Sequence, residues 1–592
     1  MLSKTEDRPV IEKSTSSHRW IILVLACLML VGSYYCFDIP AALKTQLDDH
    51  MGDPGDYELK FGLLYTLYAA PNVILPFFGG FFVDKLGVRI TLLIFCGLVT
   101  LGQIVFCIGV SMKSWPVIFI GRLIFGLGGE NFSVATSVLL ADWFKGKELA
   151  FAFGVNLSIA KLGSVFNNVV SPMLFNSVGI IFALWFGSIL CGLSMLCVIL
   201  TWPIDKAMDE RIEEQTKYAA LEDAKEEGYE EEEPEAPADM RDVFTLSHIF
   251  WVLVISCMVV YGCVLPFNNI SSTLLLERDY FMVPPSSCQL MDPDACQSDT
   301  NVPMDCPSSQ WYQPPLPVNV TASDIDCASS EWSGSDGCTT EYCDRLTDGE
   351  REASVIMSIP YIISAILSPP LGYVVDVWGL RAVIAAIAPA VLILVHMLIG
   401  YTDINVVVPL VGQGLAYTGF VSVLWPAVPL VVEERVSGLA FGIVTSAQNM
   451  ACALVPLLIA AVYTDSNDKY IPNVELVFVF FAAVGFVVGL YMNYYDYRHG
   501  SVLNRTAAEA EAAEEATAAA NSVFSPLIDP TAADVEQSNR LSMRSASVES
   551  AGGTRHRSRA SRASHDIHDP TFTRAGEMHR SGVFRHPSIT EE

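Results

Sequence analysis

The chain has 592 residues, of which 52% are hydrophobic and only 17% charged, and its mean hydropathy is +0.39. A water-soluble chain of this size is more charged and less continuously apolar, so the composition excludes that class. Much of the formal net charge of -30 comes from two polar segments, 205–242 and 507–516.

Apolar stretches long enough to cross a bilayer recur along the sequence. A helix needs roughly 20 residues to cross a hydrocarbon core of ~30 Å. Lipid offers no water to an open backbone, so runs of this length predict helices rather than sheet. The first run lacks a clear cleavage site and exceeds a typical signal core, so it is kept as a span. The predicted spans are 20–40, 60–81, 90–111, 116–140, 149–174, 180–203, 247–268, 352–375, 382–401, 405–432, 438–463 and 474–494.

We therefore expect an all-α integral membrane protein with about twelve spans, six on each side of an acidic linker. Lys and Arg are more frequent in the short loops on the side of the N-terminus, which places that side in the cytoplasm. The last segment has the composition of a disordered tail. The expected domains are a cytoplasmic tail 1–19, a six-helix bundle 20–203, a cytoplasmic linker 204–246, a six-helix bundle 247–494 that includes an outer loop 277–350, and a cytoplasmic tail 495–592.

Two short loops carry the same pattern, one in each half of the chain. Gly80–Arg89 and Gly372–Arg381 both have the form Gly-x-x-x-Asp-x-x-Gly-x-Arg. A motif that occurs once per half predicts an internally repeated transporter. The pattern resembles the signature loop of the major facilitator superfamily, which implies two pseudo-symmetric six-helix bundles. We expect the loops to latch the cytoplasmic ends in one transport state through Asp84, Gly87, Arg89, Asp376, Gly379 and Arg381.

Two opposite charges lie near the middle of neighbouring predicted spans. Glu130 is in the fourth span and Lys161 in the fifth, and a lone charge at such a depth costs at least ~2.5 kcal/mol. Either the two side chains pair and hold the helices together, or they line a cavity and bind the two ends of a zwitterion. Because both signs are present, an amino acid or peptide is favoured over a simple cation or anion.

Three further polar residues occur within predicted spans. Arg122 begins the pattern Arg-x-x-x-Gly-x-Gly, which resembles the fourth-span motif of the superfamily. Its side chain either extends to the outer end or contributes to the central cavity. Asp38 lies near the outer end of the first span, where an acid costs little, and is an alternative proton site. His396 has no obvious partner, and we expect it to be a core histidine.

The outer loop contains six of the 15 cysteines. An even cluster in a Pro- and Ser-rich loop predicts disulfides in an oxidising compartment, although six cysteines allow 15 pairings. Zinc is the weaker alternative because the loop has no His and no paired Cys-x-x-Cys. The loop also carries a glycosylation sequon at Asn319, which agrees with an outer or luminal location. The cysteines are Cys288, Cys296, Cys306, Cys327, Cys338 and Cys343.

Several longer segments resemble one branch of the superfamily, a group of lysosomal carriers. They are Gly121–Glu130, Trp143–Leu149, Leu157–Ser164, Leu424–Pro426 and Ala440–Asn449. The resemblance implies uniport of dipeptides beside a glycosylated single-span accessory subunit. The branch usually has Arg at the position of Lys161, and Lys lacks the fork that binds a carboxylate with two bonds. The implied substrate-binding residues are Glu130, Lys161, Arg122, Asn449 and Trp425.

The predicted function is alternating-access transport of dipeptides or amino acids across a lysosomal or other endomembrane, with the plasma membrane as the alternative location. Two other functions stay open. One is a proton-coupled sugar or organic-anion carrier that uses Glu130 or Asp38 as its proton site. The other is a receptor or scaffold that works through the Cys-rich loop and the tail. We expect neither an enzyme nor a cofactor, because no clustered nucleophile, metal site or phosphate loop occurs in the sequence.

Overall fold

The computed structural model describes residues 13–52, 57–145, 148–226, 239–283, 339–467 and 469–506, with isolated residues between 311 and 332 and between 508 and 512. Within this part the chain is helical apart from turns, loops and a single β-bridge between Met282 and Tyr312. The predicted all-α membrane fold is confirmed.

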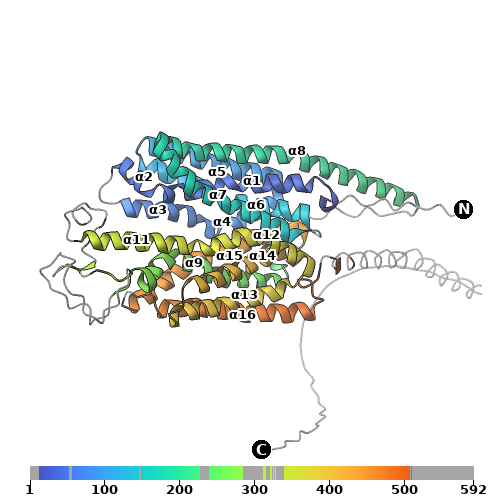
Figure 1. Ribbon diagram of the computed structural model, residues 1–592. Helices are drawn as coiled ribbons and strands as arrows, with labels where there is room; N and C mark the ends of the chain where they lie inside the picture. Colours follow the sequence, from blue (N-terminus) through green and yellow to red (C-terminus); the bar gives the residue numbers. More distant parts are fainter. Residues whose placement is uncertain are drawn as a thin grey trace, which may run out of the picture. The chain divides into compact units, whose positions relative to one another are not determined.

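The first bundle contains the helices up to residue 226, drawn in blue to teal in Figure 1. A short 3-10 turn, η1 (Lys13–Thr15), precedes it. Its elements are α1 (Arg19–Ala42), α2 (Lys44–Met51), α3 (Tyr57–Ala69), η2 (Pro71–Val73), α4 (Leu75–Leu86), α5 (Val88–Ser111), α6 (Trp115–Phe144), α7 (Leu149–Val178) and α8 (Ile180–Glu226).

The second bundle lies beside the first and is drawn in green to orange in Figure 1. Its elements are η3 (Met240–Phe244), α9 (His248–Leu275), η4 (Leu276–Tyr280), α11 (Thr340–Met357), α12 (Ile359–Trp378), α13 (Arg381–Tyr401), α14 (Val407–Ala427), η6 (Val428–Leu430), η7 (Glu434–Val436), α15 (Ser437–Asp465) and α16 (Asn473–Arg498). We call the end of the bundles that carries both signature loops the inner end.

The second predicted span is broken rather than continuous. Eleven described helices are long and apolar enough to cross a membrane, and the pair Lys60–Val73 and Leu75–Leu86, bent by 54°, brings the number to as many as twelve. Pro71 and Pro76 flank the break. Each lacks a backbone N–H, so the regular hydrogen-bond ladder is interrupted at this point.

The predicted acidic linker begins as a helix. The sequence predicts that the sixth span ends near residue 203, but α8 continues without a break to Glu226 and therefore has 47 residues. The added turns are rich in Glu, Lys and Ala, which are good helix formers. Pairs spaced four residues apart, Lys206 with Glu210 and Glu213 with Lys217, support these exposed turns.

Candidate substrate site and inner gate

Glu130 lies near the middle of α6 and is half-buried. The hydroxyl of Tyr68 donates a hydrogen bond to its Oε1 at 3.1 Å. Tyr68 is in the last turn of α3, directly before the break in the second span. The break therefore determines where this hydroxyl meets the carboxylate.

Lys161 lies near the middle of α7 and is also half-buried. Its ammonium donates to Ser364 Oγ at 2.9 Å and lies 4.5 Å from the ring centroid of Tyr417. Ser364 is on α12 and Tyr417 on α14, so this side chain crosses from the first bundle to the second. A cation over an aromatic face is attracted by the ring electrons.

Among the described residues no ion pair joins Glu130 to Lys161; the hydrogen-bond partner of each charge is a neutral hydroxyl. The structure therefore lacks the mutual pair that was one of the two expectations. A charge inside a membrane protein is stabilised most by an opposite charge. Both side chains keep some exposed surface.

Arg122 does not extend toward the outer end, which corrects one of its two predicted placements. Its side chain is buried, with 1% of the residue exposed. The guanidinium donates to the backbone oxygens of Cys36 at 3.2 Å and Phe37 at 2.9 Å. Pro40 lies four residues after Cys36 inside α1 and has no N–H to offer, so the Cys36 carbonyl is free for Arg122.

Of the other two implied binding residues, Trp425 contacts aromatic residues and Asn449 bonds to its own helix. The indole N–H of Trp425 donates to Tyr261 Oη at 3.0 Å. The Trp425 ring stacks on Phe441, whose ring stacks on Phe153 of the first bundle, with centroids 6.4 and 5.9 Å apart. This aromatic stack crosses between the bundles on the inner side of the Glu130 and Lys161 layer. The Asn449 amide donates to the backbone oxygen of Thr445 in its own helix at 3.0 Å.

His396 is confirmed as a core histidine, and the structure identifies the partner that the sequence did not show. Its Nδ1 lies 2.7 Å from Glu475 Oε2, and both residues have 0% exposure. Glu475 opens α16, and its side chain faces α13 because Gly400 leaves room for it. This pair lies between two helices of the second bundle, apart from the central layer.

At the inner end, the acid of each signature loop binds the start of a helix in the other bundle. Asp84 accepts from the backbone N–H groups of Gly438 at 2.7 Å and Leu439 at 2.6 Å, in the first turn of α15. Asp376 accepts from those of Ala150 at 3.0 Å and Phe151 at 2.8 Å, in the first turn of α7. A carboxylate in this position satisfies unpaired N–H groups and favours the positive end of the helix dipole. The two acids thus join the two bundles at the inner end.

The two loop arginines stay within their own bundles. Arg89 donates to Asp205 at 3.1 Å and Asp209 at 2.7 Å on α8. Lys13, ahead of the first span, joins both acids and Asp142. Burial alone would lower the pKa of the Lys13 ammonium, but Asp142 and Asp205 raise it above its usual value, so Lys13 remains protonated.

Arg381 differs from Arg89 in its partners. Its guanidinium donates to Asp376 Oδ1 at 3.2 Å in the same loop and to the backbone oxygen of Arg505 at 3.3 Å. The side chains of Arg381 and Asp376 are only 8% and 7% exposed. In the second loop, the acid Asp376 and the arginine Arg381 therefore form a buried charged pair. In the first loop, Asp84 binds helix N–H groups, while Arg89 pairs with acids elsewhere.

The outer loop is described only in part. Cys327 and Cys343 form a disulfide with Cα atoms 5.4 Å apart. Cys288, Cys296, Cys306, Cys338 and Asn319 lie outside the described residues. In the part of the chain that the structure describes, no group of three or more His, Cys, Asp or Glu residues is placed to hold a metal ion.

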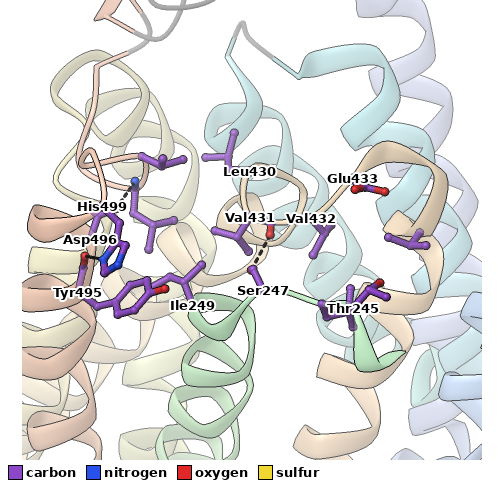
Figure 2. Close-up of a pocket in the computed structure, with 14 residues that line it drawn as sticks. Thr245, Ser247, Ile249, Leu430, Val431, Val432, Glu433, Tyr495, Asp496 and His499 are labelled. Atoms are coloured by element: carbon purple, nitrogen blue, oxygen red, sulfur yellow. Dashed lines mark hydrogen bonds between the residues drawn. The ribbon is translucent and has the colours of Figure 1, made fainter. Parts of the chain in front are cut away.

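A cavity of 430 Å³ opens at the inner end of the second bundle. Figure 2 shows Tyr495, Asp496 and His499 on one wall and Val431 on another, where Ser247 Oγ donates to the Val431 carbonyl at 2.9 Å. None of the predicted substrate residues lines this cavity. It is therefore separate from the central layer.

Comparison with known sequences agrees with this architecture. The sequence profile of the Major Facilitator Superfamily matches residues 19–282 and 346–545. The chain belongs to the major facilitator superfamily. Solved members of the superfamily share the fold: FucP in the outward conformation (TM-score 0.54, 9% identity, 80% of this chain and 99% of FucP) and the proton:xylose symporter XylE (0.53, 12%, 81% and 96%).

Within the superfamily, this chain is similar to proteins named lysosomal dipeptide transporter MFSD1. The human protein is 29% identical over 468 residues, which cover 77% of this chain and 82% of the relative. The mouse protein is 28% identical over 512 residues, which cover 84% and 91%. These proteins are transporters, in agreement with the predicted transporter class.

The sequence did not reveal the neutral partners of the central charges. Tyr68, Ser364 and Tyr417 are uncharged residues in apolar helices, where they resemble ordinary core or surface positions. The break at Pro71 was the available signal for Tyr68, because discontinuous helices in transporters often border the substrate site. No comparable signal marks Ser364 or Tyr417.

Proposed function

We propose that this protein moves small zwitterionic solutes, dipeptides or amino acids, across its membrane by alternating access. In this proposal Glu130 binds the solute ammonium group and Lys161 binds the solute carboxylate. The observation that carries it is the pair of opposite, half-buried charges on neighbouring helices, each hydrogen-bonded only to a neutral hydroxyl.

A solute carboxylate would compete with the present partners of Lys161. A charged hydrogen bond to a carboxylate is roughly twice as strong as one to a neutral hydroxyl. Binding would therefore draw the Lys161 ammonium away from Ser364 and Tyr417, which belong to the other bundle. The solute would thus weaken a contact between the bundles as it binds, which is what coupling between binding and rearrangement requires.

The inner contacts supply the second state-dependent element. In the conformation described here, Asp84 and Asp376 bond to the opposite bundle at the inner end. In this proposal these bonds keep the inner end closed. In the alternate state these carboxylates would leave α15 and α7 and bind water. Because each acid favours one state, its removal would shift the population of states while the binding groups stay in place.

The proposed location rests on the names of the relatives, and the proposed partner only on the resemblance to the lysosomal carrier branch. Because the similar proteins are named lysosomal dipeptide transporters, we propose residence in a lysosomal or related membrane. We also propose a glycosylated single-span subunit as partner, as the resemblance implies. Fractionation of native membranes tests the location. Copurification with a glycoprotein that spans the membrane once tests the partner; recovery of the full chain alone from mild detergent contradicts it.

The test of the transport proposal is uptake of a labelled, hydrolysis-resistant dipeptide by cells that display the full chain at their surface. Wild type is compared with Glu130→Gln, Lys161→Ala and Lys161→Arg, with and without a proton gradient. We expect saturable uptake by wild type, a loss of about 100-fold in the first two variants, since a buried charge-assisted contact contributes roughly 3 kcal/mol, and retained uptake in Lys161→Arg.

Lys206→Ala, which removes an exposed lysine on α8, controls for expression and handling. The absence of dipeptide uptake by a well-expressed wild type contradicts the proposal. A substrate screen with sugars and organic anions then distinguishes the carrier alternatives. Uptake that survives both Glu130→Gln and Lys161→Ala contradicts the assignment of these residues as the two poles.

A further inference from the structure

The helix that follows the second signature loop, α13, begins without a cap of its own. Its N-cap residue, Leu380, has a φ of 59° and no side-chain hydrogen-bond acceptor. The first N–H groups of a helix need partners from outside the helix. Here they come from far along the chain: Asn504 Oδ1 accepts from Ala382 N at 3.1 Å and Val383 N at 3.4 Å.

Asn504 belongs to a short segment, 499–506, that turns back after the last span. We call it the return segment. The turn is made by Gly500 and Ser501, with φ values of 99° and 55°. Asp496, near the end of α16, accepts from the backbone of Leu503 at 2.9 Å and of Asn504 at 3.2 Å. Figure 2 shows Asp496 beside Tyr495 and His499, where this turn begins.

The return segment is anchored in the core of the second bundle. Leu503 has 0% exposure. Together with residues of α9, α13, α14 and α16, Arg381 among them, it lines a cavity of only about 10 Å³. Burying a leucine side chain contributes about 2 kcal/mol. The segment is therefore part of the fold rather than a loose continuation of the last helix.

The return segment also lies directly on the second signature loop. A Cβ at Gly379 would be 2.4 Å from the Asn504 carbonyl oxygen and 2.5 Å from that of Arg505. Leu380 N donates to the Asn504 oxygen at 3.4 Å, and Arg381 donates to the Arg505 oxygen at 3.3 Å. The glycine of this loop thus makes room for the return segment.

We call the contacts of Asp84 with α15 and of Asp376 with α7 the inner gate. The return segment is linked to it by a continuous series of bonds. The return segment holds the first turn of α13 and the Arg381 guanidinium. Arg381 pairs with Asp376, and Asp376 caps α7 of the first bundle. At Gly87, the corresponding glycine of the first loop, an added Cβ would have no neighbouring atom within 4 Å. The arrangement is therefore specific to the second loop.

We propose that Asn504 is a positioning residue for the inner gate: it fixes the start of α13 and, with the neighbouring backbone, holds Arg381 so that Asp376 caps α7. Asn504 acts through these groups and does not touch a solute. The proposal rests on the alternating access proposed above for this protein, but not on which solute is carried.

The test measures opening of the inner gate without any solute. Ser368 is 2% exposed, and its backbone oxygen would lie 2.5 Å from a Cβ on Gly154 of α7, so it is enclosed where α12 meets α7. In the full chain, Ser368→Cys serves as a reporter. Its rate of reaction with a membrane-impermeant maleimide, applied to the inner face of sealed vesicles, reports how often the bundles separate there.

Asn504→Ala in this background removes the acceptor at the start of α13. Loss of a helix cap shifts an equilibrium by about fivefold, so we expect about fivefold faster labelling. Asn504→Asp keeps the acceptor and is expected to label within about twofold of the parent, because Asp and Asn cap helices about equally well. Val502→Ala, in the same segment but 43% exposed, is the matched control and is expected to leave the rate unchanged.

Equal labelling of Asn504→Ala and the parent overturns the proposal. The proposal is also overturned when Asn504→Asp or Val502→Ala shows the same rise in labelling rate as Asn504→Ala. Asn504→Ala without the Ser368→Cys reporter measures the reaction of the native cysteines; a rise as large as that in the reporter background shows that labelling does not report on Ser368→Cys and also overturns it. Should Asn504→Ala fail to reach the membrane, Asn504→Ser, with its shorter acceptor, is measured instead. Because no solute is used, a failed dipeptide assay does not affect the outcome.

Discussion

The two signature loops have the same sequence pattern, but only two of the four motif positions make equivalent contacts. In both loops the first glycine and the acid face the other bundle. A Cβ at Gly80 would lie 2.0 Å from the Gly438 oxygen, and one at Gly372 would lie 2.3 Å from the Ala150 oxygen. Asp84 and Asp376 then cap α15 and α7. The part of the motif that crosses between the bundles is therefore symmetric.

The remaining two positions of the motif differ. Arg89 pairs with acids on α8, and Gly87 has open space around it. Arg381 pairs with the acid of its own loop, and Gly379 lies against the return segment. The repeated pattern thus specifies how the bundles meet, whereas each bundle supports its loop with whatever neighbours it has.

The largest effects are expected at the symmetric contacts. Gly80→Ala and Gly372→Ala each place a methyl group against a backbone oxygen that cannot move aside. Overpacking of this kind costs about 1–3 kcal/mol, so opening at the inner end is favoured and uptake from the outer face falls roughly 10- to 100-fold in both variants. Uptake by surface-displayed protein measures this. Gly192→Ala, on an open face of α8, is the control. A normal uptake rate in either Gly80→Ala or Gly372→Ala would contradict the equivalence of the two contacts.

Substitution of the acid is expected to have a larger effect in the second loop than in the first. Asp376→Asn leaves Arg381 buried without its charged partner, which costs about 3–5 kcal/mol. Asp84→Asn keeps an acceptor for the helix N–H groups and loses only the negative charge that favours the positive end of the helix dipole, at about 0.5 kcal/mol. We expect a clear loss of thermal stability in the first variant and a small one in the second, which slows transport with little change in apparent affinity. Equal melting temperatures for the two variants would contradict the difference, and an unchanged flux in Asp84→Asn would contradict the latch.

The smallest effect is expected at Arg89. Its side chain is 31% exposed and Asp209 39%, so solvent screens this pair. The second partner, Asp205, is only 5% exposed but keeps Lys13 as another cation, so we expect Arg89 to contribute at most about 1 kcal/mol. Arg89→Gln should therefore lower thermal stability slightly at low salt and not at all at high salt. Arg381→Gln, at a buried site, should lower it at both. A salt-independent loss in Arg89→Gln would show that the first loop resembles the second after all.

The sequence was sufficient to predict features that repeat along the chain or that depend on its composition. Long apolar runs predicted the helices, and the paired loops predicted the superfamily, both of which are confirmed. The assignment of Glu130 and Lys161 to a solute stays a prediction. Contacts between distant single residues were not predictable: Glu475 lies 79 positions from His396, and nothing in the local sequence marks it as a partner.

Some of the missed features had a physical signal that became clear only with the structure. Pro40 inside the first span leaves a carbonyl free, which is a reason for a buried donor such as Arg122 to lie nearby. The extension of α8 agrees with the helix propensity of its residues. Asn504 had no such signal, because a polar residue after the last span is expected to be solvated whether or not it caps a helix.

The length of α8 has an electrostatic consequence. A helix of 47 residues is about 70 Å long, more than twice the ~30 Å that a hydrocarbon core occupies. Its final turns, 205–226, contain more acidic than basic residues. A cytoplasmic leaflet has a negative surface potential, which decays within a Debye length of about 8 Å. Repulsion at short range would keep this rod from lying on the lipid, so the start of the acidic linker would be held in solution, away from the membrane surface.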